Sequence, residues 1–130
     1  MEYSVSPEGE KYKLPEEQDY AKECERLEKL AEEQRKNGRE IVVVMGLGFV
    51  GAVMAGVVAD SGDKYVIGMQ RPSTRSYWKI PLFNKGISPV KAEDPEVETM
   101  IRRCVNEKKT MTATYTYDAL KLADVLVVDV

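Results

Sequence analysis

The chain has 130 residues and a mass of 14.7 kDa, which is room for one compact domain and excludes a large multidomain enzyme within these residues. Apolar residues make up 43% and charged residues 32%, so the composition is that of a globular protein and not of a disordered or fibrous one. The net charge is −3 and the basic residues are scattered, which makes nucleic acid an unfavourable partner. Two distant cysteines and no histidine predict no metal site and exclude Ser-His and Cys-His catalysis.

The longest apolar stretch is interrupted by glycines, so the sequence predicts neither a membrane span nor a membrane partner. The N-terminal residues 1–13 are polar and lack the pattern of a signal peptide. We therefore expect a cytoplasmic protein.

Residues 1–38 are expected to form a charged helical extension. The segment Pro15–Asn37 has proline at the start, acidic residues in the first turn, basic residues in the last and a glycine directly after it. Apolar residues recur at helical spacing within this segment: Tyr20, Cys24, Leu27, Leu30 and Ala31. This helix is expected to pack on the domain or on another chain, and a specific interaction role is the alternative.

The middle of the chain has the pattern of a strand, a tight turn, a helix and a second strand. Ile41–Met45 is apolar on both faces, as a central strand of a parallel sheet must be. A glycine-rich turn follows, and Tyr65–Met69 is a second apolar strand. The helix between them is expected to face the sheet with the large apolar residues Val50, Val53, Met54, Val57 and Val58.

The remainder continues the alternation of helices and strands. Arg71–Val90 contains three prolines and a glycine and is expected to be irregular, with Tyr77, Trp78 and Phe83 either pinning it to the domain or touching a ligand. A helix over Asp94–Asn106 and a strand over Thr110–Thr116 follow. The last elements expected are a short helix, Tyr117–Leu122, and a fully apolar strand, Val125–Val130.

These elements predict an α/β fold, a Rossmann-like doubly wound parallel sheet with an extra N-terminal helix. The four strands would lie in the order 3-2-1-4, which is a partial sheet, and residues 39–130 would form a dinucleotide-binding domain truncated after its fourth strand. An uncovered apolar edge on that last strand predicts that the isolated chain self-associates or binds its cofactor weakly.

The turn after the first strand of this domain has the spacing Gly46-x-Gly48-x-x-Gly51. Gly46 would allow the tight turn, Gly48 the approach of a pyrophosphate and Gly51 the packing of the helix on the sheet. The backbone N–H groups of Phe49 and Val50, at the positive end of the helix dipole, would then hold the phosphates. Its position between a strand and a helix favours dinucleotide binding, and a merely structural turn is the alternative.

The second strand is followed by Gln70, where NAD-binding domains carry an acidic residue that accepts from the ribose 2′-OH. Gln70 can still hydrogen-bond a ribose hydroxyl. Arg71 and Arg75 follow directly, and an arginine here can accommodate a 2′-phosphate, although an exposed loop charge explains them equally well. The expected cofactor is NAD, with NADP left open.

Four segments resemble, in order, the N-terminal NAD-binding domain of the UDP-glucose/UDP-N-acetylhexosamine 6-dehydrogenases: Gly46–Gly51, Tyr65–Gly68, Phe83–Val90 and Asp118–Val125. The Asn84-Lys85-Gly86-Ile87-Ser88-Pro89 element is more specific than the glycines, because generic Rossmann domains lack it. The resemblance implies oxidation of the C6 alcohol of a nucleotide sugar to a carboxylate by NAD, through a covalent intermediate on a cysteine. It also implies a homo-oligomer.

The chain departs from this family at Gln70 and in the longer Arg71–Leu82 loop that follows it. The family's catalytic residues and its sugar-binding domain lie beyond the fourth strand, so we expect no catalytic residue here and a nucleotide-sugar partner bound through a further C-terminal part. Cys24 and Cys104 have no candidate base and are expected to be buried or half-buried filler. The alternative function is a stand-alone, non-catalytic nucleotide-binding or interaction module.

Overall fold

The computed structural model describes residues 2–91 and 93–128. Its centre is a parallel sheet of four strands in the order β5-β4-β3-β6. The strands are β3 (Glu40–Met45), β4 (Lys64–Met69), β5 (Met111–Thr114) and β6 (Val125–Val128). Numbered within the sheet this is 3-2-1-4, so the predicted α/β, partly Rossmann-like topology is confirmed. Residues 129 and 130 of the predicted last strand lie outside the described residues.

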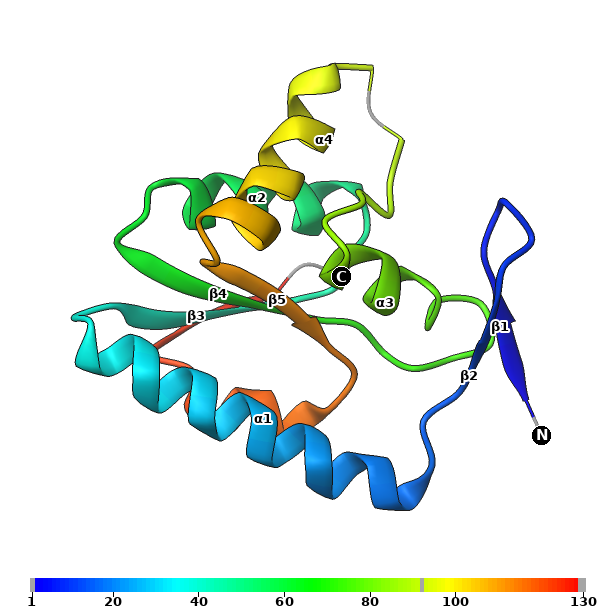
Figure 1. Cartoon of the computed structure of the whole chain (residues 1–130), viewed down its shortest axis with the longest axis horizontal. Helices are drawn as coiled ribbons and strands as arrows, with labels where there is room; N and C mark the ends of the chain where they lie inside the picture. The colour runs from blue at the N-terminus through cyan, green and yellow to red at the C-terminus, as the bar shows by residue number, and fades with distance from the viewer. Residues whose placement is uncertain (1, 92, 129–130) are drawn as a thin grey trace.

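Helices cover both faces of the sheet (Figure 1). On one face lie α2 (Phe49–Asp60) and α4 (Pro95–Arg102), which continues as a π-helical turn, η1 (Arg103–Glu107). On the other face lie α1 (Glu17–Lys36) and a 3₁₀-helix, η2 (Tyr117–Leu122). Alternate residues of the central strand point to the two layers, and this creates one apolar core above the sheet and one below it.

The N-terminal helix packs on the domain, as the sequence predicted. Leu27 and Ala31 of α1 are 1% exposed and share a core with Ile41 and Val43 of β3. The helix begins at Glu17 because Glu16 and the helical Asp19 form a capping box around its first turn. The charged segment is thus held to the sheet by its thin apolar stripe.

The predicted inner face of α2 is wrong for three of its five residues, while Val58 packs against the core as predicted. The large residues Val50, Met54 and Val57 are 54%, 37% and 59% exposed. The buried face instead consists of small residues: Gly51, Ala52, Ala55, Gly56 and Ala59. Small side chains allow the helix to approach the sheet and α4 closely; a Cβ on Gly56 would lie 2.5 Å from Cε of Met100. Close packing therefore decided the orientation of a helix that is apolar on nearly every side.

The long connection after β4 is not irregular throughout, because it contains a short helix, α3 (Lys79–Asn84). Ile80 and Phe83 of this helix are buried at 3% and 0% exposure. The predicted pinning role is confirmed for Phe83 in the core and for Tyr77, whose ring meets that of Tyr115 edge to face at 5.9 Å. The prolines that predicted a loop did not prevent a helix of six residues.

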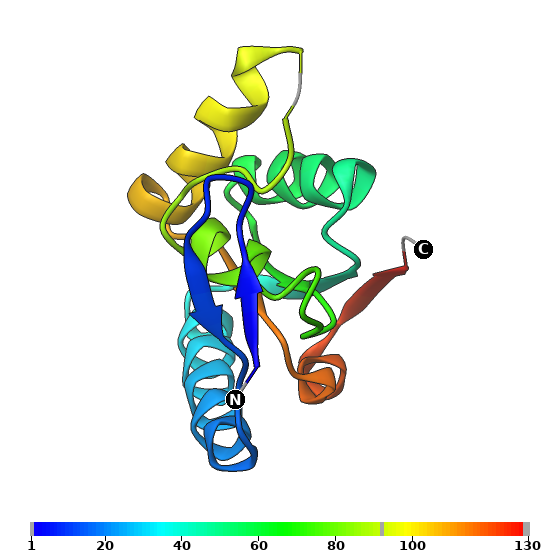
Figure 2. The ribbon, with the colours of Figure 1, turned by 90° about the vertical axis from the view of Figure 1, so that its right-hand side faces the viewer.

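A two-stranded hairpin at the N-terminus, β1 (Tyr3–Val5) and β2 (Lys11–Lys13), is absent from the sequence prediction. It stands at the end of the molecule beside the connection that follows β4 (Figure 2). The Trp78 N–H donates to Oγ of Ser4 at 3.0 Å, and the Lys85 ammonium lies 5.5 Å from the centre of the Tyr12 ring. Strands of three residues carry too little hydrophobic periodicity to be recognised in a sequence.

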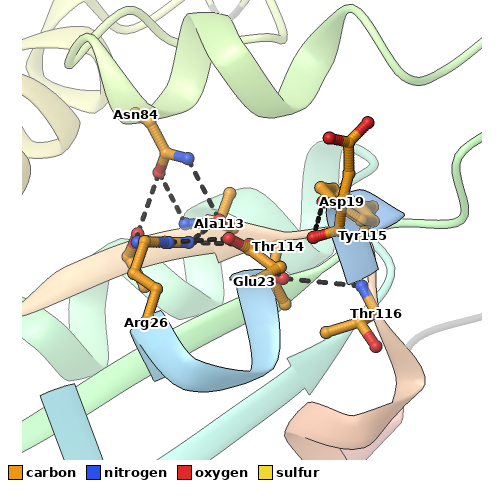
Figure 3. A network of polar contacts seen from close by, with 9 residues as sticks. Asp19, Glu23, Arg26, Asn84, Ala113, Thr114, Tyr115 and Thr116 are labelled. Atoms are coloured by element: carbon orange, nitrogen blue, oxygen red, sulfur yellow. Dashed lines mark hydrogen bonds and ion pairs between the residues drawn. The ribbon is translucent and has the colours of Figure 1, made fainter. Parts of the chain in front are cut away.

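The outer edge of β5 is sealed by side chains (Figure 3). The Ala113 N–H donates to Oδ1 of Asn84 at 2.7 Å, and the Ala113 carbonyl accepts from Nδ2 of Asn84 at 3.0 Å. The Asn84 amide thereby replaces the peptide group of a neighbouring strand. Arg26 of α1 donates to the same carbonyl at 3.1 Å and is itself held by both carboxylate oxygens of Glu23 at 2.8 Å. The β5 edge is therefore closed to further strand pairing at Ala113.

The opposite edge is open within the described residues, where β6 pairs only with β3. Val125, Leu126 and Val128 are 43%, 47% and 57% exposed. The uncovered apolar edge predicted from the sequence is present on the described part of this strand.

Candidate cofactor site

The predicted site residues gather at the carboxyl ends of the parallel strands. β3 ends at Met45 and leads into Gly46, and the neighbouring β4 ends at Met69 and leads into Gln70. From β3 the chain proceeds to β4 and then β5, whereas β6 returns to the other side of β3. The glycine turn therefore lies at the point where the strand order reverses, which is where open parallel sheets bind their ligands.

The turn is held to β4 at its first residue. Gly46 has φ of +95°, a conformation that other residues adopt only with strain, and its N–H donates to the Met69 carbonyl at 2.8 Å. The next residue, Leu47, is fully buried, and its side chain fills the space above Gly68 of β4. A Cβ on Gly68 would lie 2.6 Å from Cδ2 of Leu47. The turn thus depends on two glycines, Gly46 in the turn itself and Gly68 within β4.

The third residue of the turn, Gly48, is the N-cap of α2 and offers no side chain to the helix end. The first helical hydrogen bond runs from the Ala52 N–H to the Gly48 carbonyl at 2.9 Å, so the N–H groups of Phe49, Val50 and Gly51 have no acceptor within the helix. A Cβ on Gly48 would meet no heavy atom within 4 Å. This open approach to free N–H groups at the positive end of a helix fits an anionic phosphate.

Gln70 is tied to the same turn. Its Oε1 accepts from the Leu47 N–H at 2.9 Å, and its own N–H donates to the Thr114 carbonyl of β5 at 3.0 Å. The side chain therefore bridges the ends of adjacent strands before any ligand arrives.

Arg71 is exposed and begins a compact turn. Its carbonyl accepts from the Ser73 N–H at 3.0 Å and from Oγ of Ser76 at 2.7 Å. The structure brings the backbone of all seven predicted residues to the carboxyl ends of β3 and β4. The guanidinium of Arg71 has no hydrogen bond or ion pair to the described residues. Their role in binding a cofactor stays a prediction.

Sequence reasoning missed Leu47 and Gly68, which position the turn without facing a ligand. The signal that could have found them is the glycine inside the otherwise large and apolar strand Tyr65–Met69, because such a glycine marks a close approach by another part of the chain. It also missed Ser73 and Ser76, whose hydroxyls lie 2.7 Å apart.

Neither cysteine is placed as a nucleophile. Cys104 is buried beneath α2, and burial raises the pKa of its thiol. The Cys24 thiol donates to Oδ2 of Asp118 at 2.9 Å, and this hydrogen bond raises its pKa. Both effects disfavour the thiolate, which is the reactive form.

Across residues 2–91 and 93–128, no cluster of His, Cys, Asp or Glu side chains is arranged to hold a metal ion. Over the same residues, no helix is both long and apolar enough to cross a membrane.

Comparison with known proteins links this geometry to one group of enzymes. No protein-family model and no curated protein matches the chain. Among solved structures, the chain is similar to an NDP-N-acetyl-D-galactosaminuronic acid dehydrogenase from Methanosarcina mazei Go1, with a TM-score of 0.66 and 31% sequence identity. The match covers 80% of this chain and 22% of that one. The resemblance predicted from the sequence is confirmed: in fold and in sequence, the chain matches the N-terminal domain of a nucleotide-sugar dehydrogenase.

Proposed function

We propose that this chain is the cofactor-binding part of a nucleotide-sugar 6-dehydrogenase that oxidises the C6 alcohol of its sugar to a carboxylate with a nicotinamide dinucleotide. The observation that carries the proposal is the glycine turn. It leaves the first N–H groups of α2 free and accessible, and it lies where the strand order of the parallel sheet reverses. The similarity to the dehydrogenase from Methanosarcina mazei Go1 supports it.

Each residue of the turn has a defined task in this proposal. Gly46 turns the chain off β3, Gly48 leaves room for the pyrophosphate, and Gly51 lets α2 approach the sheet. The N–H groups of Phe49 and Val50 bind the phosphate oxygens. The bound nicotinamide supplies the hydride acceptor, and the residues of this chain hold it in place.

The proposal assigns no catalytic residue to these 130 residues. The chain spans about a fifth of the length of the dehydrogenase it matches, 22%. The proton transfers, the covalent intermediate and the nucleotide-sugar site are therefore assigned to a further C-terminal part, and homo-oligomerisation is proposed on the same resemblance.

Calorimetric titration of the chain with NAD⁺ and NADP⁺ tests the proposal. Wild-type protein is expected to bind at least one of them, and Gly48→Val is expected to abolish binding because its side chain occupies the approach to the phosphates. The fold should persist, since a Cβ at Gly48 meets nothing and its φ of −71° suits any residue.

Val57→Ala is the matched control, because Val57 lies on the exposed side of the same helix. It should leave affinity unchanged. Absence of binding by the wild type, or equal affinity in wild type and Gly48→Val, would overturn the proposal.

A further inference from the structure

We infer that the segment Gln70–Ser76 is a subsite for a 2′-phosphate, so that the cofactor of this chain is NADP(H) in preference to NAD(H). The inference rests on the proposed function, since it concerns the adenosine ribose of the same dinucleotide. It follows from three features of the segment: the orientation of the Gln70 amide, the local charge and the preformed turn.

The Gln70 amide presents hydrogen-bond donors where an NAD site needs an acceptor. A backbone N–H can only donate, so the Leu47 N–H fixes Oε1 of Gln70 towards the glycine turn. The Nε2 group of the same amide has no hydrogen-bond partner among the described residues. A ribose 2′-OH recognised by a carboxylate donates its proton, whereas a phosphate oxygen accepts. The Nε2 donor is complementary to the phosphate.

The charged side chains of the surrounding segment are all basic. From Gln70 to Lys91 the sequence contains no acidic residue and five basic ones: Arg71, Arg75, Lys79, Lys85 and Lys91. Arg71 and Arg75 are exposed, and neither guanidinium has a hydrogen bond or ion pair with the described residues. In a chain of net charge −3 this is a local excess of positive charge, and it directly follows the strand that ends beside the glycine turn.

The turn that carries both arginines is already formed. Ser76 Oγ donates to the Arg71 carbonyl at 2.7 Å, so Ser73 is the donor in the 2.7 Å hydrogen bond between the two hydroxyls. At the other end, Nε1 of Trp78 donates to the Arg75 carbonyl at 2.7 Å. The serine protons and the carbonyls of both arginines are therefore committed to the turn, while the guanidinium groups are left for a ligand.

The segment thus offers a phosphate two kinds of donor: the Gln70 amide and the guanidinium groups of Arg71 and Arg75. Guanidinium groups bind phosphate through paired hydrogen bonds that are stronger than neutral ones. A 2′-OH can still accept from the Gln70 amide, but it brings no negative charge to the two guanidinium groups. The segment thus discriminates for the phosphorylated ribose.

Calorimetry on the 130-residue chain with NADP⁺ and NAD⁺ provides the test. Wild-type protein is expected to bind NADP⁺ at least about tenfold more tightly, the ratio that one charge-assisted contact supports. Arg71→Ala combined with Arg75→Ala should weaken NADP⁺ binding by roughly 10- to 100-fold and change NAD⁺ binding by less than about threefold. Arg102→Ala, which removes an exposed arginine from α4, is the control and should change neither.

Gln70→Glu tests the role of the Gln70 amide independently of the arginines. The carboxylate keeps an acceptor for the Leu47 N–H but replaces the Nε2 donor with an acceptor, so the NADP⁺/NAD⁺ preference should fall. Equal or tighter binding of NAD⁺ by the wild type would overturn this inference and leave the proposed function standing. An NADP⁺ preference that survives the double arginine substitution would overturn the assignment of the subsite, and failure to bind either dinucleotide would overturn the proposed function itself.

Discussion

The backbone N–H of Leu47 donates to Oε1 of Gln70 at 2.9 Å, which joins the glycine turn after β3 to the end of β4. Leu47 is fully buried, so its N–H depends on this partner. The residue that replaces the family's acidic group is therefore part of the turn's own architecture. Changes at Gln70 must be judged by stability as well as by cofactor affinity.

Gln70→Leu should lower the free energy of unfolding by about 1–3 kcal/mol, because it leaves the buried Leu47 N–H without an acceptor. Gln70→Glu keeps an acceptor at nearly the same place and should lose much less. Denaturant unfolding followed by circular dichroism measures both. Equal stability of the wild type and Gln70→Leu would show that the hydrogen bond contributes nothing to the fold.

Asn84→Ala should destabilise the protein by about 1–3 kcal/mol, since the buried Ala113 N–H loses its acceptor. The Ala113 carbonyl keeps the hydrogen bond from Arg26, so the loss falls on the Ala113 N–H and on the Thr112 hydroxyl, which also donates to Oδ1 of Asn84 at 3.0 Å. Asn84→Asp retains an oxygen for that N–H and is expected to lie between the wild type and Asn84→Ala in thermal unfolding. The reverse order of the two variants would contradict the strand-like role of the amide.

Asp60 at the end of α2 joins this helix to η1 and the residue after it. Its carboxylate accepts from Nε and Nη2 of Arg103 at 2.9 and 2.8 Å and lies 2.9 Å from the Lys108 ammonium. The Arg103 hydrogen bonds, followed by those of Lys108, hold the pKa of Asp60 well below its usual range. A carboxyl whose pKa is depressed in the folded state stabilises the fold above its unfolded pKa and loses this effect as the pH falls through the folded value.

Asp60→Asn should therefore lower stability by about 1 kcal/mol at pH 7, a value reduced by the partial exposure of the pair. The difference from the wild type should shrink below about pH 4, where the unfolded carboxyl takes up its proton. Denaturant unfolding at a series of pH values tests this, with Glu98→Gln on the exposed side of α4 as the control. A difference that stays constant down to pH 2 would argue against the ion pairs as its source.

The open edge of β6 should make the isolated chain self-associate. Leu126 lies opposite Val43 in the sheet and is 47% exposed, so Leu126→Lys places a charge at the apolar edge and should weaken association. Val57→Lys adds the same charge on the exposed side of α2, away from any strand edge, and should leave association unchanged. Sedimentation velocity measures the three proteins. A monomeric wild type at high concentration would refute the expectation.

The sequence was sufficient for features that depend on neighbouring residues. Hydrophobic periodicity predicted the four strands and the N-terminal helix, and the glycine spacing predicted the turn, because each is set by local backbone preference and alternating burial. The order 3-2-1-4 was predicted from the Rossmann-like alternation of strands and helices around the glycine turn, and the sheet has this order.

Only the tertiary structure decided which face of α2 is buried, what closes the β5 edge and what Gln70 does. Val50, Met54 and Val57 are as apolar as a core requires, but the helix lies too close to the sheet and to α4 for large side chains to fit between them. Asn84 meets Ala113, and Leu47 meets Gln70, only after distant segments have come together. Contacts between residues far apart in the chain leave no periodic signal in the sequence, and so the seal of the sheet edge and the orientation of the Gln70 amide were settled by packing.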